Sequence, residues 1–362
     1  MKMQTKCLAL VCTAAVLTAA ICVGCGKTAA TGSGSGSAVV QQSGEIPSAQ
    51  KDVFAMDAYM SLTAYGANAQ TAIDECVEEI TRLDELFSVS IEDSEITLAN
   101  EGNTVLISDE TEELIEHALK IEDLTDGAFT VTMYPLTREW GFPTQKYHVL
   151  SKKKRKKLLK RVGGDKVHLE TNTNTMMLDK GTEIDLGGIA KGYLGDRLRD
   201  IMKEQGIESA MLSLGGSTVE LIGSKTDGQP WRIGIMNPSD NEKTIGAVAV
   251  TDCVVDTSGG YQRFFKKNGK TYWHILDPET GSPARSGLSS VTIVGNDGTM
   301  GDALSTALFV MGRDKALEYW REHSDEFQAV LVEDDGSITI TEGLEDCFES
   351  REKFEVAHLE ET

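Results

Sequence analysis

The feature that most constrains the fold is the alternation of strand-like and helix-like patterns after residue 50. Apolar residues recur at helical spacing over 71–87, and from residue 166 onward short apolar runs bounded by glycine alternate with further helical patterns. No linker-like composition interrupts this part of the chain. We therefore expect a single α/β domain over 51–345, with mixed sheets and flanking helices, followed by an acidic C-terminal tail over 346–362.

The periodicities predict individual elements. Helices are expected over 71–87, 110–124, 190–206 and 300–311, the second of them with a capping box formed by Asp109 and Glu112. One strand is expected over 54–65, ended by Gly66, and a hairpin over 166–180. Residues 182–188 read as an extended stretch that leads into the helix at 190. Further strands are expected over 209–215, 218–223, 230–236, 246–258, 271–277, 288–294, 327–334 and 337–343.

The N-terminus resembles a bacterial lipoprotein signal peptide over 1–24. Lys2 and Lys6 precede an uncharged run over 7–24 that is long enough for a signal sequence but short for a spanning helix. Gly24 precedes Cys25, which we expect to be the lipidated residue after cleavage; an ordinary secretory signal is the alternative. Residues 25–50 are rich in Gly, Ser and Ala and are expected to form a flexible tether. The domain would then be anchored at the extracytoplasmic face of the membrane.

Charge and cysteine content restrict the function further. The net charge of -22 argues against a general nucleic-acid binder, and we expect no nucleic-acid partner. Cys76, Cys253 and Cys347 remain in the folded part, with neither a disulfide framework nor metal-ligand spacing, and Cys76 is expected in the core. The basic run over 151–161 is interpreted as a solvated helix face, with contact to anionic lipid headgroups as the alternative.

Three distant segments carry residues suited to chemistry. In IDLGGIAKGYLGD (184–196), glycines at the start of a helix allow close approach of a ligand, helix-end amides favour an anion, and Lys191 adds a positive charge. For this segment taken alone, a structural hinge is the favoured interpretation. In HILDPETGSPA (274–284), His274 precedes a turn and has the chemistry of a base, although for this segment alone a histidine packed on the strand is the favoured interpretation.

The third segment is GDALSTALFVMG (301–312). Asp302 and Thr306 are four residues apart, so they share one helix face, and oxygen ligands of this kind suit Mg²⁺. The alternative is an acidic residue in the first turn that favours the helix dipole, with Thr306 facing solvent. Together the three segments indicate phosphoryl or pyrophosphate chemistry, in which positioning and Mg²⁺ carry most of the catalysis.

The order of motifs resembles the ApbE-type FAD:protein FMN transferases. The resemblance extends over 54–331 and rests on GAFTVTMYPLTREWGF, IDLGGIAKGY, AMLSLGGS, DTSGGYQRFF, HILDPETGSP and GDALSTALFVMG. It implies a Mg²⁺-dependent reaction in which a threonine hydroxyl of a target protein attacks the FMN-side phosphorus of FAD and AMP leaves. It also implies targets among membrane redox subunits, such as those of sodium-pumping and Rnf-type complexes.

The resemblance assigns roles residue by residue. It implies Asp302, Thr306 and the carbonyl near Gly188 as magnesium ligands, and Asp302 and His274 as catalytic residues, with His274 taking the threonine proton at an ordinary histidine pKa. The residues implied in FAD contact are Met56, Ala128, Phe129, Asp185, Lys191 and His274, with Gly215, Gly216 and residues 257–259 lining the same cleft. The chain departs from the family pattern at Met56–Ala58, at Thr130 and at Ser90.

Two other functions fit the same sequence. With water as the acceptor, the chain would be a Mg²⁺-dependent FAD pyrophosphatase that releases FMN and AMP. A non-catalytic flavin-binding lipoprotein would carry the same signal and tether, but it would need neither His274 nor the Asp302–Thr306 pair.

Overall fold

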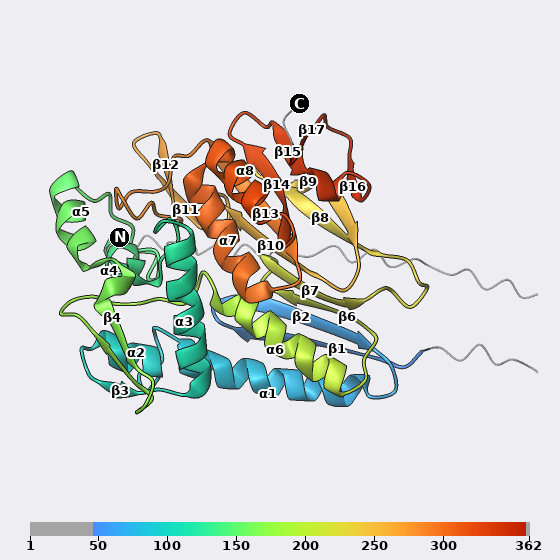
Figure 1. Ribbon diagram of the computed structural model, residues 1–362, viewed down its shortest axis with the longest axis horizontal. Helices are drawn as coiled ribbons and strands as arrows, with labels where there is room; N and C mark the ends of the chain where they lie inside the picture. The colour runs from blue at the N-terminus through green and yellow to red at the C-terminus, as the bar shows by residue number, and fades with distance from the viewer. Residues whose placement is uncertain (1–45, 360–362) are drawn as a thin grey trace, which may run out of the picture. The chain divides into compact units, whose positions relative to one another are not determined.

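The computed structural model describes residues 46–359, and its centre is a nine-stranded sheet (Figure 1). The strand order is β1-β2-β6-β7-β10-β13-β14-β15-β17, and every neighbouring pair is antiparallel except β15 and β17. The strands are β1 (Ser48–Ala55), β2 (Ala58–Tyr65), β6 (Ser209–Leu214), β7 (Thr218–Gly223), β10 (Val254–Gly259), β13 (Leu288–Gly295), β14 (Phe327–Glu333), β15 (Ile338–Thr341) and β17 (Glu355–Ala357).

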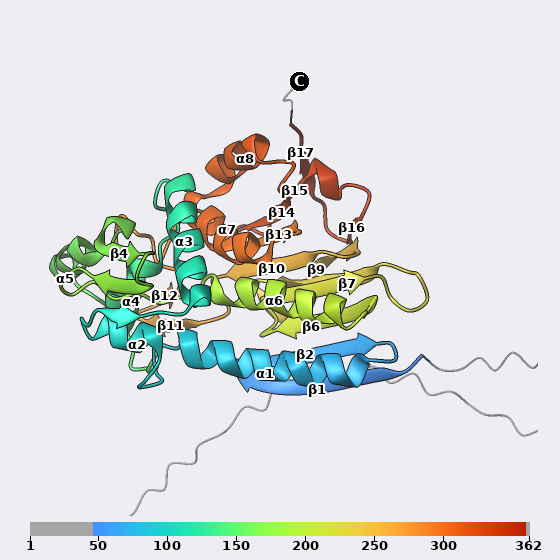
Figure 2. The same cartoon turned by 60° about the horizontal axis from the view of Figure 1, so that its bottom comes forward.

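Helices cover one face of this sheet. They are α1 (Ala69–Phe87), α6 (Ala190–Glu204), α7 (Gly298–Met311) and α8 (Arg313–Glu322). α1 contacts β1 and β2, α6 contacts β6 and β7, and α7 contacts β10 and β13. Figure 2 shows α1, α6 and α7 following one another along the sheet. The apolar positions of α1 recur every three or four residues and so lie on one face of the helix. Ile73, Ile80 and Leu83 on this face are all fully buried.

The opposite face packs against a second, three-stranded sheet. Its strands, in the order β16-β9-β8, are β8 (Trp231–Asn237), β9 (Asp240–Val250) and β16 (Phe348–Ser350). Val255 of β10 and Val330 of β14 pack with Val248 of β9 in one buried cluster. Successive side chains of a strand point to opposite faces, so alternate residues of β10 face the helices and this second sheet.

The remaining elements belong neither to these two sheets nor to the four helices that cover the larger one. They are α2 (Glu95–Asn100), β3 (Val105–Leu106), α3 (Asp109–Leu124), η1 (Val131–Met133), α4 (Tyr134–Trp140), α5 (Lys152–Leu158), η2 (Leu159–Arg161), η3 (Gly164–Lys166), β4 (Val167–Glu170), β5 (Thr175–Leu178), β11 (Phe264–Lys267), β12 (Lys270–Trp273) and η4 (Glu342–Leu344). β3, β5 and β4 form a small sheet, and β11 and β12 form a hairpin. Trp140, Phe142 and Phe265 pack together beside that hairpin.

Several predictions of elements are confirmed. The helices expected over 71–87, 110–124, 190–206 and 300–311 correspond to α1, α3, α6 and α7, and the hairpin over 166–180 to β4 and β5. Cys76 is fully buried in the core, as expected, and Cys76, Cys253 and Cys347 are free thiols. The basic run forms α5 and η2, whose side chains at Lys152, Lys153, Lys156, Lys157 and Lys160 are exposed.

Other predictions are wrong. The strand expected over 54–65 is two strands, because Met56 and Asp57 adopt φ of 48° and 57° and turn β1 back onto β2. The strand expected over 246–258 is likewise broken near Asp252, with φ of 46°, where the chain passes from the small sheet to the large one. The cap of α3 is Ser108, whose hydroxyl accepts from Thr111 N, rather than a capping box at Asp109 and Glu112.

The ends of the folded region also differ from expectation. Residues 182–188 form no strand, and β1 already begins at Ser48. The C-terminal segment that we expected as a tail contributes β16 and β17, which pair with β9 and β15. The signal peptide, Cys25 and the tether up to residue 45 lie outside the described residues. Within residues 46–359, no helix has the length and apolar character needed to cross a membrane.

Candidate functional site

The N-terminal turns of α6 and α7 meet at Gly192. A Cβ at Gly192 would lie 1.9 Å from the carbonyl oxygen of Gly298 and 2.9 Å from the Cβ of Asp302. No side chain fits at that distance, so only glycine allows the two helices to approach this closely. The sequence motif that we interpreted as a hinge or an anion cradle is therefore also the contact between these two helices.

This contact places Lys191 beside Asp302. Asp302 Oδ2 accepts hydrogen bonds from Lys191 Nζ and from Gly192 N, both at 3.2 Å. Asp302 is only 5% exposed, and Lys191 Nζ also donates to the carbonyl oxygen of Gly187 at 3.2 Å. The segments 184–196 and 301–312, which the sequence predicted to carry chemistry, are therefore in direct contact through Lys191, Gly192 and Asp302.

The alternative interpretation of Asp302 is wrong. α7 begins at Gly298, so Asp302 lies in the second turn, and the residue that caps the helix is Asp297, whose Oδ1 accepts from Met300 N at 2.8 Å. Thr306 is half-buried, and its Oγ1 forms a hydrogen bond with Ser258 Oγ at 2.9 Å. Neither residue is a solvent-facing surface group.

The three predicted magnesium ligands lie together. A Cβ at Gly188 would be 4.0 Å from Thr306 Oγ1 and 3.3 Å from Phe129 Cε2, so this backbone lies against α7 and Phe129. Asp302 lies one turn before Thr306 on the same helix face. A buried carboxylate, a hydroxyl and a backbone carbonyl are oxygen donors of the kind that Mg²⁺ takes, usually with one or two carboxylates only. Within 46–359 no group of three or more His, Cys, Asp or Glu side chains is arranged to hold a metal, so a metal here would use this mixed set.

His274 follows β12 and is held by the main chain of Arg263. His274 N donates to the carbonyl oxygen of Arg263 at 3.0 Å, and His274 Nδ1 lies 3.2 Å from the same oxygen. A carbonyl oxygen can only accept, so Nδ1 carries the proton and Nε2 carries the free lone pair. The ring also meets the edge of Phe142, with centroids 6.4 Å apart, so it is packed as well as oriented.

The expectation of an ordinary pKa for His274 is wrong. Burial lowers the pKa of His274 to about 4, and the positive charges of Arg263 and Lys191 lower it further in the same direction. The imidazole is therefore neutral near pH 7. A neutral ring with a free Nε2 is in the protonation state that a proton acceptor needs.

The loop before α6 is fixed from several sides. Asp185 Oδ1 accepts from Gly187 N at 2.9 Å, and Asp185 N donates to the carbonyl oxygen of Val131 at 2.9 Å. The side chain of Asn100 bonds both the N–H and the carbonyl of Ile184. Burial raises the pKa of Asp185, while Arg263 and Lys191 act in the opposite direction, so both cations lie near this carboxyl group.

The β1–β2 turn closes another side of the same region. A Cβ at Gly215 would lie 2.7 Å from Ala58 Cβ and 4.0 Å from Lys191 Cδ. The side chain of Arg263 lies within 3.4 Å of the Asp57 carbonyl oxygen and 4.0 Å of its carboxylate. Through these contacts, the turn that carries Met56 is linked to the segment that holds His274.

The other predicted contact residues have mixed outcomes. Phe129 is buried next to Gly188, whereas Ala128 is half-buried. Ser258 faces α7, but Thr257 points to the other face of the sheet, where its Oγ1 pairs with Thr292 Oγ1 at 2.9 Å. The side chain of Thr257 therefore does not face α7. The Thr130 hydroxyl accepts from Thr132 N and so caps the short helix η1.

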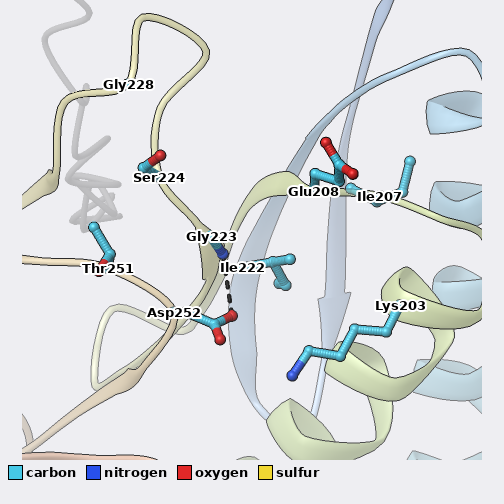
Figure 3. A pocket seen from close by; sticks show the side chains of 9 residues that line it. All are labelled: Lys203, Ile207, Glu208, Ile222, Gly223, Ser224, Gly228, Thr251 and Asp252. Carbon is cyan, nitrogen blue, oxygen red and sulfur yellow. Dashed lines mark hydrogen bonds between the residues drawn. The ribbon is translucent and has the colours of Figure 1, made fainter.

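A separate pocket of about 490 Å³ lies away from these residues (Figure 3). Lys203, Glu208, Ile222, Gly223 and Asp252 are among its lining residues, and Asp252 accepts a hydrogen bond from Gly223 N. Lys203, Ile222 and Gly223 come from the C-terminal ends of α6 and β7, Glu208 directly precedes β6, and Asp252 lies between β9 and β10. Lys191 and Gly215 lie at the opposite ends of α6 and of the β6–β7 pair. The predicted site residues do not line it.

Sequence reasoning missed two residues that the structure places at the site. Arg263 supplies the carbonyl that orients His274 and a charge next to Asp185. Asp256 lies fully buried beside α7. Both occur within the motif DTSGGYQRFF, from which the resemblance assigns only residues 257–259 to the cleft; a charged residue inside a buried strand is the signal available for Asp256.

Comparison with known proteins decides the family. Residues 56–331 match the model of the ApbE family. The chain belongs to this family. Relatives named FAD:protein FMN transferase include a protein of Vibrio cholerae serotype O1, 32% identical over 273 residues, which are 74% of this chain and 80% of the relative. Another, of Haemophilus influenzae, is 30% identical over 291 residues, which are 77% and 83% of the two chains.

Solved ApbE structures share the fold. The ApbE protein of Thermotoga maritima superposes with a TM-score of 0.78 at 34% identity, covering 84% of this chain and all of the other. The flavin transferase ApbE from Vibrio cholerae gives a TM-score of 0.74 at 26% identity, with the same coverage of 84% and 100%. The mixed α/β fold and the ApbE resemblance that the sequence predicted are thereby confirmed.

Proposed function

We propose that this ApbE-family protein transfers FMN from FAD to a threonine hydroxyl of target proteins in a Mg²⁺-dependent reaction. The observation that carries the proposal is the contact of Lys191 Nζ with Asp302 Oδ2 at 3.2 Å, since it joins a cation and a candidate metal ligand at the meeting point of two helix N-termini. The names of the relatives, FAD:protein FMN transferase, support the same chemistry.

The residues present fit a magnesium ion. Asp302, Thr306 and the carbonyl of Gly188 would hold it, and the bound ion would neutralise the pyrophosphate of FAD. The protein itself supplies the remaining positive charge. Lys191 and the N-terminal turn of α6 stabilise the charge that develops on the phosphoryl oxygens.

His274 accepts the proton of the attacking hydroxyl at Nε2, because Nδ1 already donates to the Arg263 carbonyl. The threonine oxygen forms a bond to the FMN-side phosphorus, and the bond from that phosphorus to the bridging oxygen breaks. AMP leaves with the bridging oxygen, and FMN remains attached through a phosphoester. The proton held by His274 then passes to AMP or to solvent.

The location belongs to the same proposal. A lipidated Cys25 and a tether up to residue 50 would hold the domain at the extracytoplasmic face of the membrane. Threonine-bearing subunits of membrane redox complexes, of the sodium-pumping or Rnf type, would be within reach there. The exposed lysines of α5 suit contact with anionic headgroups, which remains the alternative to a merely solvated helix face.

Incubation with FAD and Mg²⁺, with and without a candidate redox subunit, tests the proposal. We expect AMP to be released in equal amount to covalent flavin on the subunit, and little AMP without it. AMP and FMN formed at the same rate without the subunit would support the pyrophosphatase instead. Bound but unconverted FAD under all conditions would support the flavin-binding lipoprotein.

A further inference from the structure

Asp256 of β10 is a buried carboxylate that the proposed reaction leaves without a role. The residue is 0% exposed, and among the residues that the structure describes no cationic side chain is hydrogen-bonded to its carboxyl group. Thr218 lies opposite on β7, and its hydroxyl is the neutral partner of this carboxyl group. A carboxylate at such a depth without a bonded cation is costly, so its presence calls for a physical reason.

The strand presents Asp256 to the metal-site helix. Asp256 and Ser258 are two residues apart on β10, so their side chains point to the same face, toward α7. Ser258 Oγ contacts Thr306 Oγ1 at 2.9 Å and Ser305 Oγ at 2.8 Å. One helical turn earlier, a Cβ at Gly301 would lie 2.4 Å from Asp256 Oδ2. Asp256 thus lies against the turn that carries Asp302, just as Ser258 lies against the turn that carries Thr306.

Gly301 is the residue that makes room for this carboxylate. At 2.4 Å from Asp256 Oδ2, a side chain at position 301 would displace either the strand residue or α7. The close approach of the α7 backbone to this carboxylate therefore depends on both Gly301 and Asp256. It brings a second acidic group to the region of Asp302.

The nearby charges do not neutralise Asp256. The charged side chains that act on it are Asp302, Lys191 and Glu220. Lys191 Nζ is bonded to Asp302 and to the Gly187 carbonyl. The other nearby acid, Glu220, is paired with Arg199 at 2.5 Å. The carboxyl groups of Asp256 and Asp302 thus lie in a region where Lys191 is the nearby cation.

We propose that Asp256 is a further carboxylate of the divalent-cation site, and that its charge increases the affinity of this site for Mg²⁺. The inference rests on the metal site of the proposed function. Asp256 acts together with Asp302, either directly or through a metal-bound water, and the cation supplies the positive charge that the surrounding protein lacks. The cost of burying this carboxyl group without a bonded cation in the free protein is then offset when the cation binds.

Titration calorimetry of the protein with Mg²⁺ tests this inference, with neither FAD turnover nor an acceptor involved. Asp256→Asn keeps the size of the side chain and removes its charge. We expect the Mg²⁺ Kd to rise by about 10-fold or more, as for other supporting groups of metal sites. We also expect Mg²⁺ to raise the Tm of the variant less than that of the wild-type protein. Asp256→Ser, with a smaller polar side chain, should show the same loss of affinity and provides the measurement if the asparagine variant folds poorly.

Glu79→Gln is the matched control. Glu79 is a mostly buried carboxylate on α1 whose charge is paired with Arg82 and Arg197, and it lies away from α7. Its loss should leave the Mg²⁺ Kd unchanged. Equal Mg²⁺ affinity of the wild-type protein and both Asp256 variants would overturn the inference alone. A wild-type protein that binds no Mg²⁺, with or without FAD, would overturn the metal assignment and this inference with it.

Discussion

Lys191 Nζ on α6 lies 3.2 Å from Asp302 Oδ2 on α7, with both side chains largely buried. The pair joins two segments that are far apart in the sequence, and it is possible only because Gly192 lets the helices touch. A lysine held beside a buried carboxylate keeps one position, so its charge is already placed when an anionic substrate arrives. The pair therefore favours a preorganised site over a simple structural hinge.

Lys191→Met should reduce the rate of FMN transfer by about 10²-fold or more, because a fixed positive charge on the phosphoryl oxygens is lost. Covalent flavin on the acceptor, followed over time by gel fluorescence, gives the rate. Lys203→Met, at the other end of α6 and beside the distant pocket, is the control and should behave like the wild-type protein. If the Lys191 variant transfers FMN within twofold of the wild-type rate, the charge of Lys191 does not contribute to the reaction.

His274→Asn should lower kcat by about 10²–10⁴-fold, the usual contribution of a positioned general base. The FAD Kd, measured by flavin fluorescence, should rise far less than kcat falls, because the main loss lies in proton transfer. His168→Asn is the control, because His168 is exposed and paired only with Asp179. Transfer at the wild-type rate in His274→Asn would exclude the residue as the base.

The pH dependence follows from the lowered pKa of His274. With a pKa of about 4 in the free protein, the imidazole stays neutral down to that pH, so the acid limb of kcat/KM should be centred near pH 4. An acid limb centred near 6.5, the ordinary histidine value, would contradict the buried, cation-flanked environment.

Stability should respond to pH through the same group. The pKa of His274 is lower in the folded state than in the unfolded state. Its contribution to the free energy of unfolding is therefore fully present above the unfolded pKa, near 6.5, and is lost as the pH falls toward 4. Urea midpoints measured between these pH values should therefore fall less steeply for His274→Asn than for the wild-type protein. Parallel curves for the two proteins would show that His274 does not contribute.

Gly192→Ala should destabilise the protein by about 1–3 kcal/mol, as overpacking does, because its methyl group meets the Gly298 carbonyl at 1.9 Å. It should also abolish transfer, since α7 moves away from Lys191. Gly195→Ala on the same helix is the control: its nearest neighbour, Glu220 Oε2 at 3.3 Å, belongs to a side chain. Urea unfolding and the transfer assay measure the two effects, and equal behaviour of both variants would show that the helix contact is not critical.

The sequence predicted the helices and the catalytic segments well, because their signals are local. The spacing of Ile73, Ile80 and Leu83 defined α1, and the spacing of Asp302 and Thr306 defined one face of α7. Turns without glycine were missed. Met56 and Asp57 form the β1–β2 turn with positive φ, a conformation that neither residue type signals strongly.

Features that depend on long-range contacts could not be predicted. The opposite orientations of Thr257 and Ser258 depend on which faces of β10 meet α7 and β8–β9. The pKa of His274 depends on burial and on Arg263 and Lys191, which the chain brings from two other segments. The buried position of Asp256 is set by its contact with Gly301, 45 residues further along the sequence.

The most direct test of the central claim is covalent flavinylation by Asp302→Ala. The wild-type protein and the variant are each incubated with FAD, Mg²⁺ and a threonine-bearing redox subunit, and covalent flavin is read by gel fluorescence while FAD binding is followed separately. We predict that the variant still binds FAD but forms no covalent flavin product. Undiminished flavinylation by Asp302→Ala would contradict the account.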